Sequence, residues 1–159
     1  MKKRLPSTLA AAALIGLGTC PAAADAQELD AHLDCKSNAH TFISSLLTDA
    51  VIEPKPMRVE KNSVNAFRPV RGTKLTAFGF RVYAVVGYEQ GDDMFKPGSG
   101  EPLSHPVYGV VVSGSMDKVT QRVKSAGIDA DTREVTPLLM TAIICSGPSL
   151  QPSSQSPSQ

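Results

Sequence analysis

Alternation of apolar and mixed positions is clearest over residues 75–88. Every second side chain from Phe78 to Tyr88 is apolar, and the side chains between them are mixed in character. This pattern predicts a strand with one buried face and one wetter face. Gly79 interrupts the run and indicates either a bulge or the turn of a hairpin. Weaker alternation over residues 57–67 predicts one or two short strands.

A helical pattern precedes these strands. From Glu28 to Val51, apolar residues recur at steps of three and four, which predicts one amphipathic helix. Pro54 then prevents the helix from continuing. Cys35 lies on the apolar stripe of this helix, so we expect its side chain to face the core.

The C-terminal half of the chain has the order strand, helix, strand. Residues 107–112 and 138–145 are apolar at both parities, which is typical of central strands covered on both faces. Between them a helical pattern begins after Ser115, a good N-cap residue, and ends before Gly127. This order predicts a parallel pair of strands joined by a right-handed crossover. Residues 132–136 alternate weakly and indicate an edge strand or a bulge.

The segment between the two halves, residues 90–106, is rich in turn-forming residues. It contains three glycines, three prolines and the acidic residues Asp92, Asp93 and Glu101. Its length leaves two interpretations open, an ordered functional loop or a disordered connection. Residues 148–159 consist mainly of serine, proline and glutamine, a composition that cannot build a core, so we expect this tail to be disordered.

The first 26 residues predict a secretory signal peptide of bacterial type. Positive residues at positions 2–4 are followed by an apolar run over 9–18, which is far shorter than the roughly 20 residues that cross a bilayer. Small residues precede a cleavage position after Ala26. An alternative is a lipoprotein leader in which Cys20 is acylated. No transmembrane segment is expected once the leader is removed.

Length and charge limit the class of the mature chain. The 159 residues carry 16 Lys and Arg against 15 Asp and Glu, and removal of residues 1–26 takes away three basic residues and Asp25, which leaves a net charge of −1. A balance so close to neutral excludes a strongly basic nucleic-acid-binding protein. The sequence therefore predicts one α+β domain over residues 27–147. We expect one mixed, mostly antiparallel sheet with an N-terminal helix and a second helix in a βαβ crossover.

Two cysteines, Cys35 and Cys145, remain after the leader is removed. An exported chain meets an oxidising compartment, so we expect the two residues to form one disulfide. The alternatives are a metal pair or a catalytic thiol. A metal site favours further ligands at short spacing, and Cys145 has none beside it.

Short motifs for nucleophilic and metal chemistry are incomplete. Residues 115–118 match S-x-x-K and residues 63–65 match S-x-N, but their order is the reverse of the penicillin-binding and β-lactamase signature and no K-T-G follows. His32 and His40 lack ligands at clean metal-binding spacing, so we interpret them as solvated, with a zinc or copper role as the alternative. We therefore predict no catalytic residue, no metal and no cofactor.

Charge is distributed unevenly along the mature chain. Residues 53–81 hold seven basic and two acidic residues, whereas residues 89–101 hold one basic and four acidic residues. Such polarity can steer a partner of opposite charge. The alternative is a set of ordinary solvated charges at strand edges, where Lys and Arg discourage sheet pairing. The predicted binding residues are Arg58, Arg68, Arg71, Lys74 and Arg81.

These observations predict a small exported, non-enzymatic binding module, such as an envelope inhibitor or an immunity-type protein. We expect its partner to be a protein in the cell envelope or outside the cell, and its location to be the periplasm or the medium. Two alternatives remain open. One is a binder of anionic glycan or lipid headgroups through the basic segment. The other is a small envelope hydrolase whose candidate residues are Asp92, Asp93, Glu101 and His105.

Overall fold

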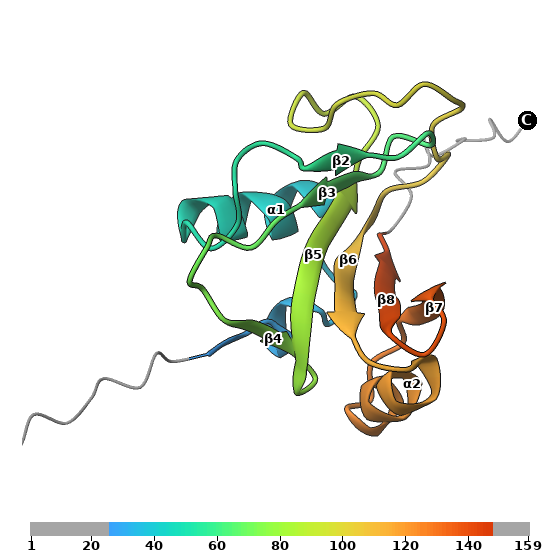
Figure 1. Cartoon of the computed structure of the whole chain (residues 1–159). Coiled ribbons are helices and arrows are strands. Elements are labelled where there is room, and N and C mark those ends of the chain that lie inside the picture. The colour runs from blue at the N-terminus through green and yellow to red at the C-terminus, as the bar shows by residue number, and fades with distance from the viewer. Residues whose placement is uncertain (1–25, 148–159) are drawn as a thin grey trace, which may run out of the picture.

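Eight strands form one mixed sheet with two α-helices against it (Figure 1). They belong to residues 26–147, the part of the chain that the computed structural model describes. The strands are β1 (Gln27–Glu28), β2 (Arg58–Val59), β3 (Asn65–Phe67), β4 (Leu75–Ala77), β5 (Phe80–Tyr88), β6 (Val107–Ser113), β7 (Asp131–Thr136) and β8 (Met140–Ser146). The helices are α1 (Ala39–Thr48) and α2 (Met116–Ser125), with a 3-10 turn at Asp30–His32. The predicted leader up to Asp25, Cys20 and the tail over 148–159 lie outside the described residues.

The strand order is β1-β4-β5-β6-β8-β7, and β3 pairs with β5 and with β2. β1 is parallel to β4, and every other pair among these strands is antiparallel. The prediction of an α+β domain with one mostly antiparallel sheet is therefore confirmed. The weak pattern over 57–67 corresponds to the short hairpin of β2 and β3.

The crossover through α2 differs from the expected one. The strand over 107–112 and the strand over 138–145 were predicted to be a parallel pair, but β6 and β8 are antiparallel neighbours. A tight turn joins β7 to β8, so β8 runs back and inserts between β6 and β7. α2 thus connects two parallel strands, β6 and β7, that are separated by one strand. β7 lies at the edge of the sheet, as the pattern over 132–136 indicated.

The core lies between the sheet and α1, which is behind the sheet in Figure 1. Phe42, Ile43 and Leu46 of α1 are almost fully buried. A Cβ atom at Gly87 of β5 would lie 2.8 Å from Cγ1 of Ile43, so glycine at this position lets the helix approach the strand closely. α1 therefore covers the middle of the sheet.

α2 packs against the same face of the sheet. Val119 and Val123 of α2 are buried in the same core as α1. The hydroxyl oxygens of Thr120 on α2 and Thr132 on β7 are 2.7 Å apart. Thr132 pairs with Ile143 of β8, which is fully buried in that core. Both helices thus lie on one side of the sheet.

A β-bulge in β5 overturns the predicted assignment of faces. Val82 pairs with Val112 and Ala84 pairs with Val111, so Tyr83 is an extra residue on its strand. One added residue reverses the alternation beyond it. Ala84 and Val86 therefore face away from the helices, while Val85 between them faces the core. Gly79 itself lies in the turn between β4 and β5, which confirms the hairpin interpretation.

The N-terminal helix is shorter than predicted, because α1 begins only after Asn38. The side-chain oxygen of Asn38 accepts a hydrogen bond of 2.7 Å from the backbone N–H of Thr41, which caps the helix. Before it, the carboxylate of Asp30 accepts a hydrogen bond of 2.6 Å from the N–H of Phe78. Cys35 has a φ of +58°, which no helix allows. Tertiary contacts thus replace the helix that apolar spacing predicted over 28–38.

The predicted disulfide between Cys35 and Cys145 is present, with a Cα–Cα distance of 4.9 Å. Cys145 lies on β8 opposite Tyr108, on the face that α1 covers. Cys35 lies in the bend before α1, not in a helix. The bond therefore ties the start of α1 to the central part of the sheet.

The loop over 90–106 is packed against the β2–β3 hairpin. The side chain of Asn65 on β3 accepts a hydrogen bond from the N–H of Lys96 and donates one to the carbonyl of the same residue, at 3.0 Å and 2.8 Å. The hydroxyl of Ser63 accepts a hydrogen bond from Gly98. Phe95 is 7% exposed. These contacts favour the ordered interpretation of the loop.

Candidate binding surface

The sheet face opposite the helices carries two rows of small and branched side chains. The first row is Ala66, Val86, Gly109 and Ile144, and the second is Ala84, Val111 and Ala142. Paired residues on neighbouring strands project from the same face of a sheet. We call this face the open face and these seven residues the apolar strip. The described helices cover only the other face, yet Ala84 and Ala142 are 2% and 8% exposed, and Val111 and Ile144 are the partly exposed members of the strip. The prediction of burial at both parities therefore holds for most positions of 107–112 and 141–145, whereas Leu138 and Leu139 are exposed.

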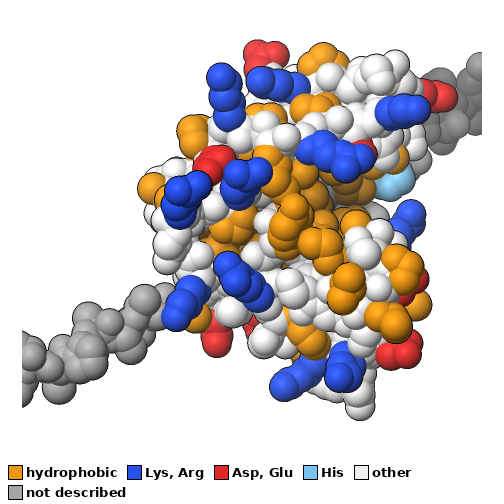
Figure 2. Space-filling view, in the orientation of Figure 1, with side chains coloured by type: hydrophobic (Ala, Val, Ile, Leu, Met, Phe, Trp, Pro, Cys, Tyr) orange, Lys and Arg blue, Asp and Glu red, His pale blue; other side chains and the backbone are white. Residues whose placement is uncertain are grey.

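The strip adjoins a hollow of about 510 Å³, the apolar hollow. Val107, Ala142 and Ile144 of the sheet line it, together with Val64 and Leu103. Figure 2 shows apolar side chains gathered across the middle of this face, with Lys and Arg side chains along its upper and left borders. The open face thus combines an apolar centre with a basic border.

A second hollow, of about 470 Å³, lies beside the bulge of β5. We call it the arginine hollow, because Arg68, Arg71 and Arg81 line it. The side chains of Glu53, Tyr83 and Ser113 also contribute to its wall. No sequence pattern singles out Glu53, Tyr83 or Ser113, because they belong to segments that are distant in sequence and meet only in the fold.

Backbone contacts hold the three arginines in place. The carbonyl of Arg68 accepts a hydrogen bond of 2.8 Å from the N–H of Glu53. Arg71 lies in a turn over 70–73 that a hydrogen bond of 3.0 Å closes. Arg81 lies in β5, paired with β4. The side chains therefore start from positions that the fold fixes.

Of the five predicted binding residues, the structure brings these three together. Arg58 is on β2, where its Nε lies 2.7 Å from Oε1 of Glu60. Lys74 does not line the arginine hollow, and its carbonyl accepts a hydrogen bond from Gln27. The basic segment is therefore not one continuous site.

The four hydrolase candidates do not form one group. Asp92 and Asp93 line a separate pocket at the loop, whereas His105 lines the apolar hollow. Glu101 is exposed and lines neither. Oγ of Ser104 lies 3.4 Å from Nδ1 of His105, and both belong to adjacent residues. The arrangement provides no nucleophile and base held by a third group.

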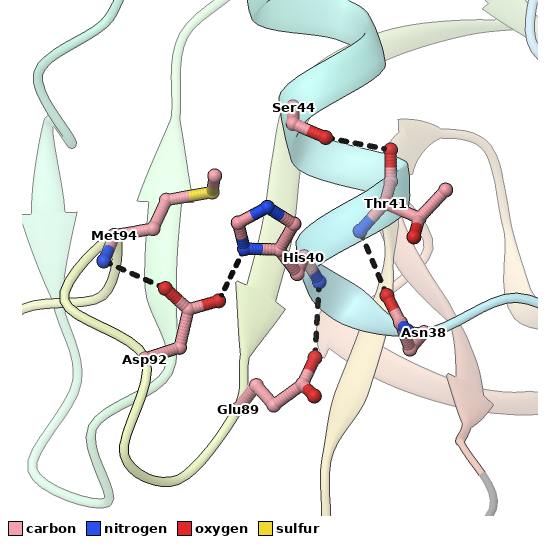
Figure 3. A network of polar contacts seen from close by, with 7 residues as sticks. All are labelled: Asn38, His40, Thr41, Ser44, Glu89, Asp92 and Met94. Carbon is pink, nitrogen blue, oxygen red and sulfur yellow. Dashed lines mark hydrogen bonds and ion pairs between the residues drawn. The ribbon is translucent and has the colours of Figure 1, made fainter.

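The histidine that does have a carboxylate partner is His40, which we had interpreted as solvated. Nδ1 of His40 lies 2.6 Å from Oδ2 of Asp92, and the N–H of His40 donates a hydrogen bond of 3.1 Å to Glu89 (Figure 3). Asp92 also accepts a hydrogen bond from Met94. This network links the loop to the first turn of α1. The imidazole remains 54% exposed, so sequence alone placed it correctly at the surface but missed its partner.

An exposed apolar turn lies between β7 and β8. Leu138 and Leu139 are 78% and 65% exposed, and Val135 is 53% exposed. Pro137 and a φ of +62° at Leu138 define a type II turn, in which glycine or asparagine is the usual residue at the position of Leu138. A leucine here exposes apolar surface and strains the backbone.

Residues 26–147 contain neither a metal-binding cluster nor a helix suited to cross a membrane. No cluster of three or more His, Cys, Asp or Glu side chains in this range is arranged to hold a metal ion. No helix in it has both the length and the apolar character needed to cross a membrane.

Comparison of the chain with protein-family models, with curated proteins and with solved structures found no match.

Proposed function

We propose that this protein is a small exported binding module that contacts a protein partner through the open face of its sheet. The apolar strip carries this proposal. In an antiparallel sheet with helices on one face, the other face is commonly solvated and polar. Here its central rows consist of alanine, valine, isoleucine and glycine. Apolar surface of this kind with a polar rim is typical of a protein interaction site.

Charged residues border the strip at both ends. Arg58 on β2 pairs with Ala66 on β3, and Arg133 on β7 pairs with Ala142 on β8. An apolar centre inside a polar rim is the usual anatomy of a protein–protein interface. Val135, the exposed apolar residue just before the β7–β8 turn, lines the apolar hollow beside the strip. An inhibitor or an immunity-type protein acts through such a surface without catalysis.

The disulfide supports a location in the periplasm or outside the cell. Disulfides persist in oxidising compartments and are rare in the cytosol. The sequence pattern of a leader points the same way, and the sequencing of the mature N-terminus tests it, with Gln27 expected as the first residue. A retained leader or an acylated Cys20 would contradict this part of the proposal.

Binding is better supported than hydrolysis, because the acidic residues and His105 lie in separate places. A hydrolytic site needs its acid, base and nucleophile within hydrogen-bond reach of one reacting atom. The described positions of Asp92, Glu101 and His105 do not provide this. The apolar strip, in contrast, is continuous across four strands.

Photo-crosslinking tests the proposed surface. Benzoylphenylalanine replaces Val111, a partly exposed residue of the strip, and the mature protein is mixed with bacterial envelope extract. We expect one adduct of defined mass, which mass spectrometry identifies. The same residue at Gln121, on the outer side of α2, is the matched control and should give no such adduct.

A blocking variant gives the decisive comparison. Ile144→Lys introduces a charge in the strip at a partly exposed position, and its thermal unfolding shows whether it is folded. A folded Ile144→Lys protein should compete poorly for the crosslinked partner. Equal adducts from Val111 and Gln121, or full competition by Ile144→Lys, would overturn the proposal.

A further inference from the structure

We infer that the arginine hollow is a binding site for a dianionic oxyanion group, a phosphate ester or a pair of carboxylates. This site goes beyond the proposed function. It is separate from the apolar strip and stands whether or not the strip has a protein partner.

Charge in the hollow favours an anion. The ion pairs among the described residues are His40 with Asp92, Arg58 with Glu60, and Arg133 with Asp131. None of them involves an arginine of the hollow. Glu53 is the one carboxylate in the lining, so the lining holds three positive charges and one negative charge. A group with two negative charges would balance it.

The residue type favours an oxyanion over other anions. A guanidinium group presents a planar fork of N–H donors that fits two oxygens of a carboxylate or a phosphate. Three arginines line the hollow, from a strand, a turn and the segment after β3. Tyr83 and Ser113, which carry hydroxyl groups, line the same hollow.

The fold fixes the backbone positions of the three arginines of the hollow, whose side chains are exposed. The carbonyl bond of Arg68, the closed turn around Arg71 and the β4–β5 pairing of Arg81 fix the three backbone positions. Tyr83 lies two residues after Arg81 in β5, so regular alternation places the two side chains on the same face. The volume of about 470 Å³ lies within the range of small-molecule sites. A phosphate ester or a citrate-sized polycarboxylate fits such a volume.

Titration of the ¹⁵N-labelled mature protein with inorganic phosphate and with citrate, at low ionic strength, tests the site. We expect saturable shifts at the amides of residues 68–73 and 81–83. Arg81→Lys keeps the charge but loses the fork, and it should weaken binding about tenfold. Glu53→Gln removes the competing carboxylate and should tighten binding about threefold.

Arg122→Lys is the matched control, because Arg122 is exposed on α2 and does not line the hollow. Its affinity should equal that of the unaltered protein. Ile144→Lys, which tests the strip, should also leave anion binding unchanged, so failure of one proposal is distinguishable from failure of the other. Shifts that do not saturate, or equal affinity of Arg81→Lys and the unaltered protein, would overturn the inference.

Vesicles distinguish the two sources of such a group. Phosphatidylcholine vesicles with and without phosphatidic acid are sedimented with the protein. Retention on phosphatidic acid that is lost in Arg81→Lys assigns the site to a lipid headgroup. Saturable phosphate or citrate binding without vesicle retention assigns it to a soluble ligand. Both results support the site.

Discussion

The ring of Tyr108 on β6 packs against the ring of Phe42 on α1, with the ring centroids 4.9 Å apart. The hydroxyl of Tyr108 accepts a hydrogen bond of 3.1 Å from the N–H of Ser37, just before the helix. Burial raises the pKa of Tyr108 above 10.0; the hydrogen bond from Ser37 lowers it, and the nearby charge of Asp34 raises it. One side chain thus joins the sheet, the helix and the segment that leads into it.

This contact predicts a specific loss of stability in alkali. The unfolded tyrosine ionises near its usual pKa, whereas the folded one keeps its proton to higher pH. The contribution of the protonated Tyr108 to the free energy of unfolding is therefore complete below pH about 10 and falls as the pH rises above it. Urea unfolding at pH 8 and pH 11 should show a smaller decline for Tyr108→Phe than for the unaltered protein.

At pH 8 the same variant should be less stable by about 1 kcal/mol, because the Ser37 N–H loses its acceptor. Tyr83→Phe is the control, since Tyr83 is 54% exposed and its loss should change neither value. An identical pH response of Tyr108→Phe and the unaltered protein would contradict the assignment.

The disulfide should supply a large share of the folding stability. It closes a loop of 110 residues, and bonds that close long loops typically stabilise by about 2–4 kcal/mol. We expect the double variant Cys35→Ala, Cys145→Ala to lose about this amount in urea unfolding. Thiol titration of the unfolded mature protein should find no free thiol before reduction and two after it. Two free thiols before reduction would show that the bond does not form.

The leucine turn should be a site where stability is sacrificed. Leu138→Asn places a residue that tolerates positive φ in the type II turn, so we expect a gain of about 1 kcal/mol in the free energy of unfolding. Leu139→Asn removes a similar apolar side chain without the backbone effect and should change stability by less than about 0.5 kcal/mol. Equal effects of the two substitutions would rule out backbone strain at Leu138.

The pair of His40 and Asp92 should act locally. Both side chains contact the loop and the helix terminus at the surface, where ion pairs contribute little to global stability. Asp92→Asn should therefore leave the melting temperature almost unchanged while amide hydrogen exchange rises over residues 89–98. The control is Asp93→Asn, because the carboxylate of Asp93 forms no hydrogen bond with a described side chain. This substitution should not raise amide hydrogen exchange over residues 89–98.

The sequence predicted those features that depend on local chemistry. Gly127 follows α2 with a φ of +73°, as expected of a residue just past a helix end. The edge position of β7 followed from weak alternation, and the cysteine pair followed from the compartment that the leader implies. Each of these requires knowledge only of neighbouring residues or of the whole chain's class.

The features that were missed depend on contacts between distant segments. Apolar spacing cannot show that Asp30 is bound to Phe78, which prevents the helix from starting at Glu28. Nor can it show the bulge at Tyr83, because every second residue remains apolar on both sides of it. The arginine hollow was predicted in part. The charge pattern identified its three arginines, but it also identified Arg58 and Lys74, which do not line the hollow.

The bulge at Tyr83 also determines which residues of β5 share one face. If Tyr83 paired as a regular strand residue, alternation would turn Arg81 toward the helices whenever Ala84 and Val86 faced outward. Arg81 and the apolar strip therefore share one face of the sheet because of the bulge, not because of the type of any side chain. A chain of the same composition and charge in which β5 paired without the bulge would therefore lose the relation between the two hollows.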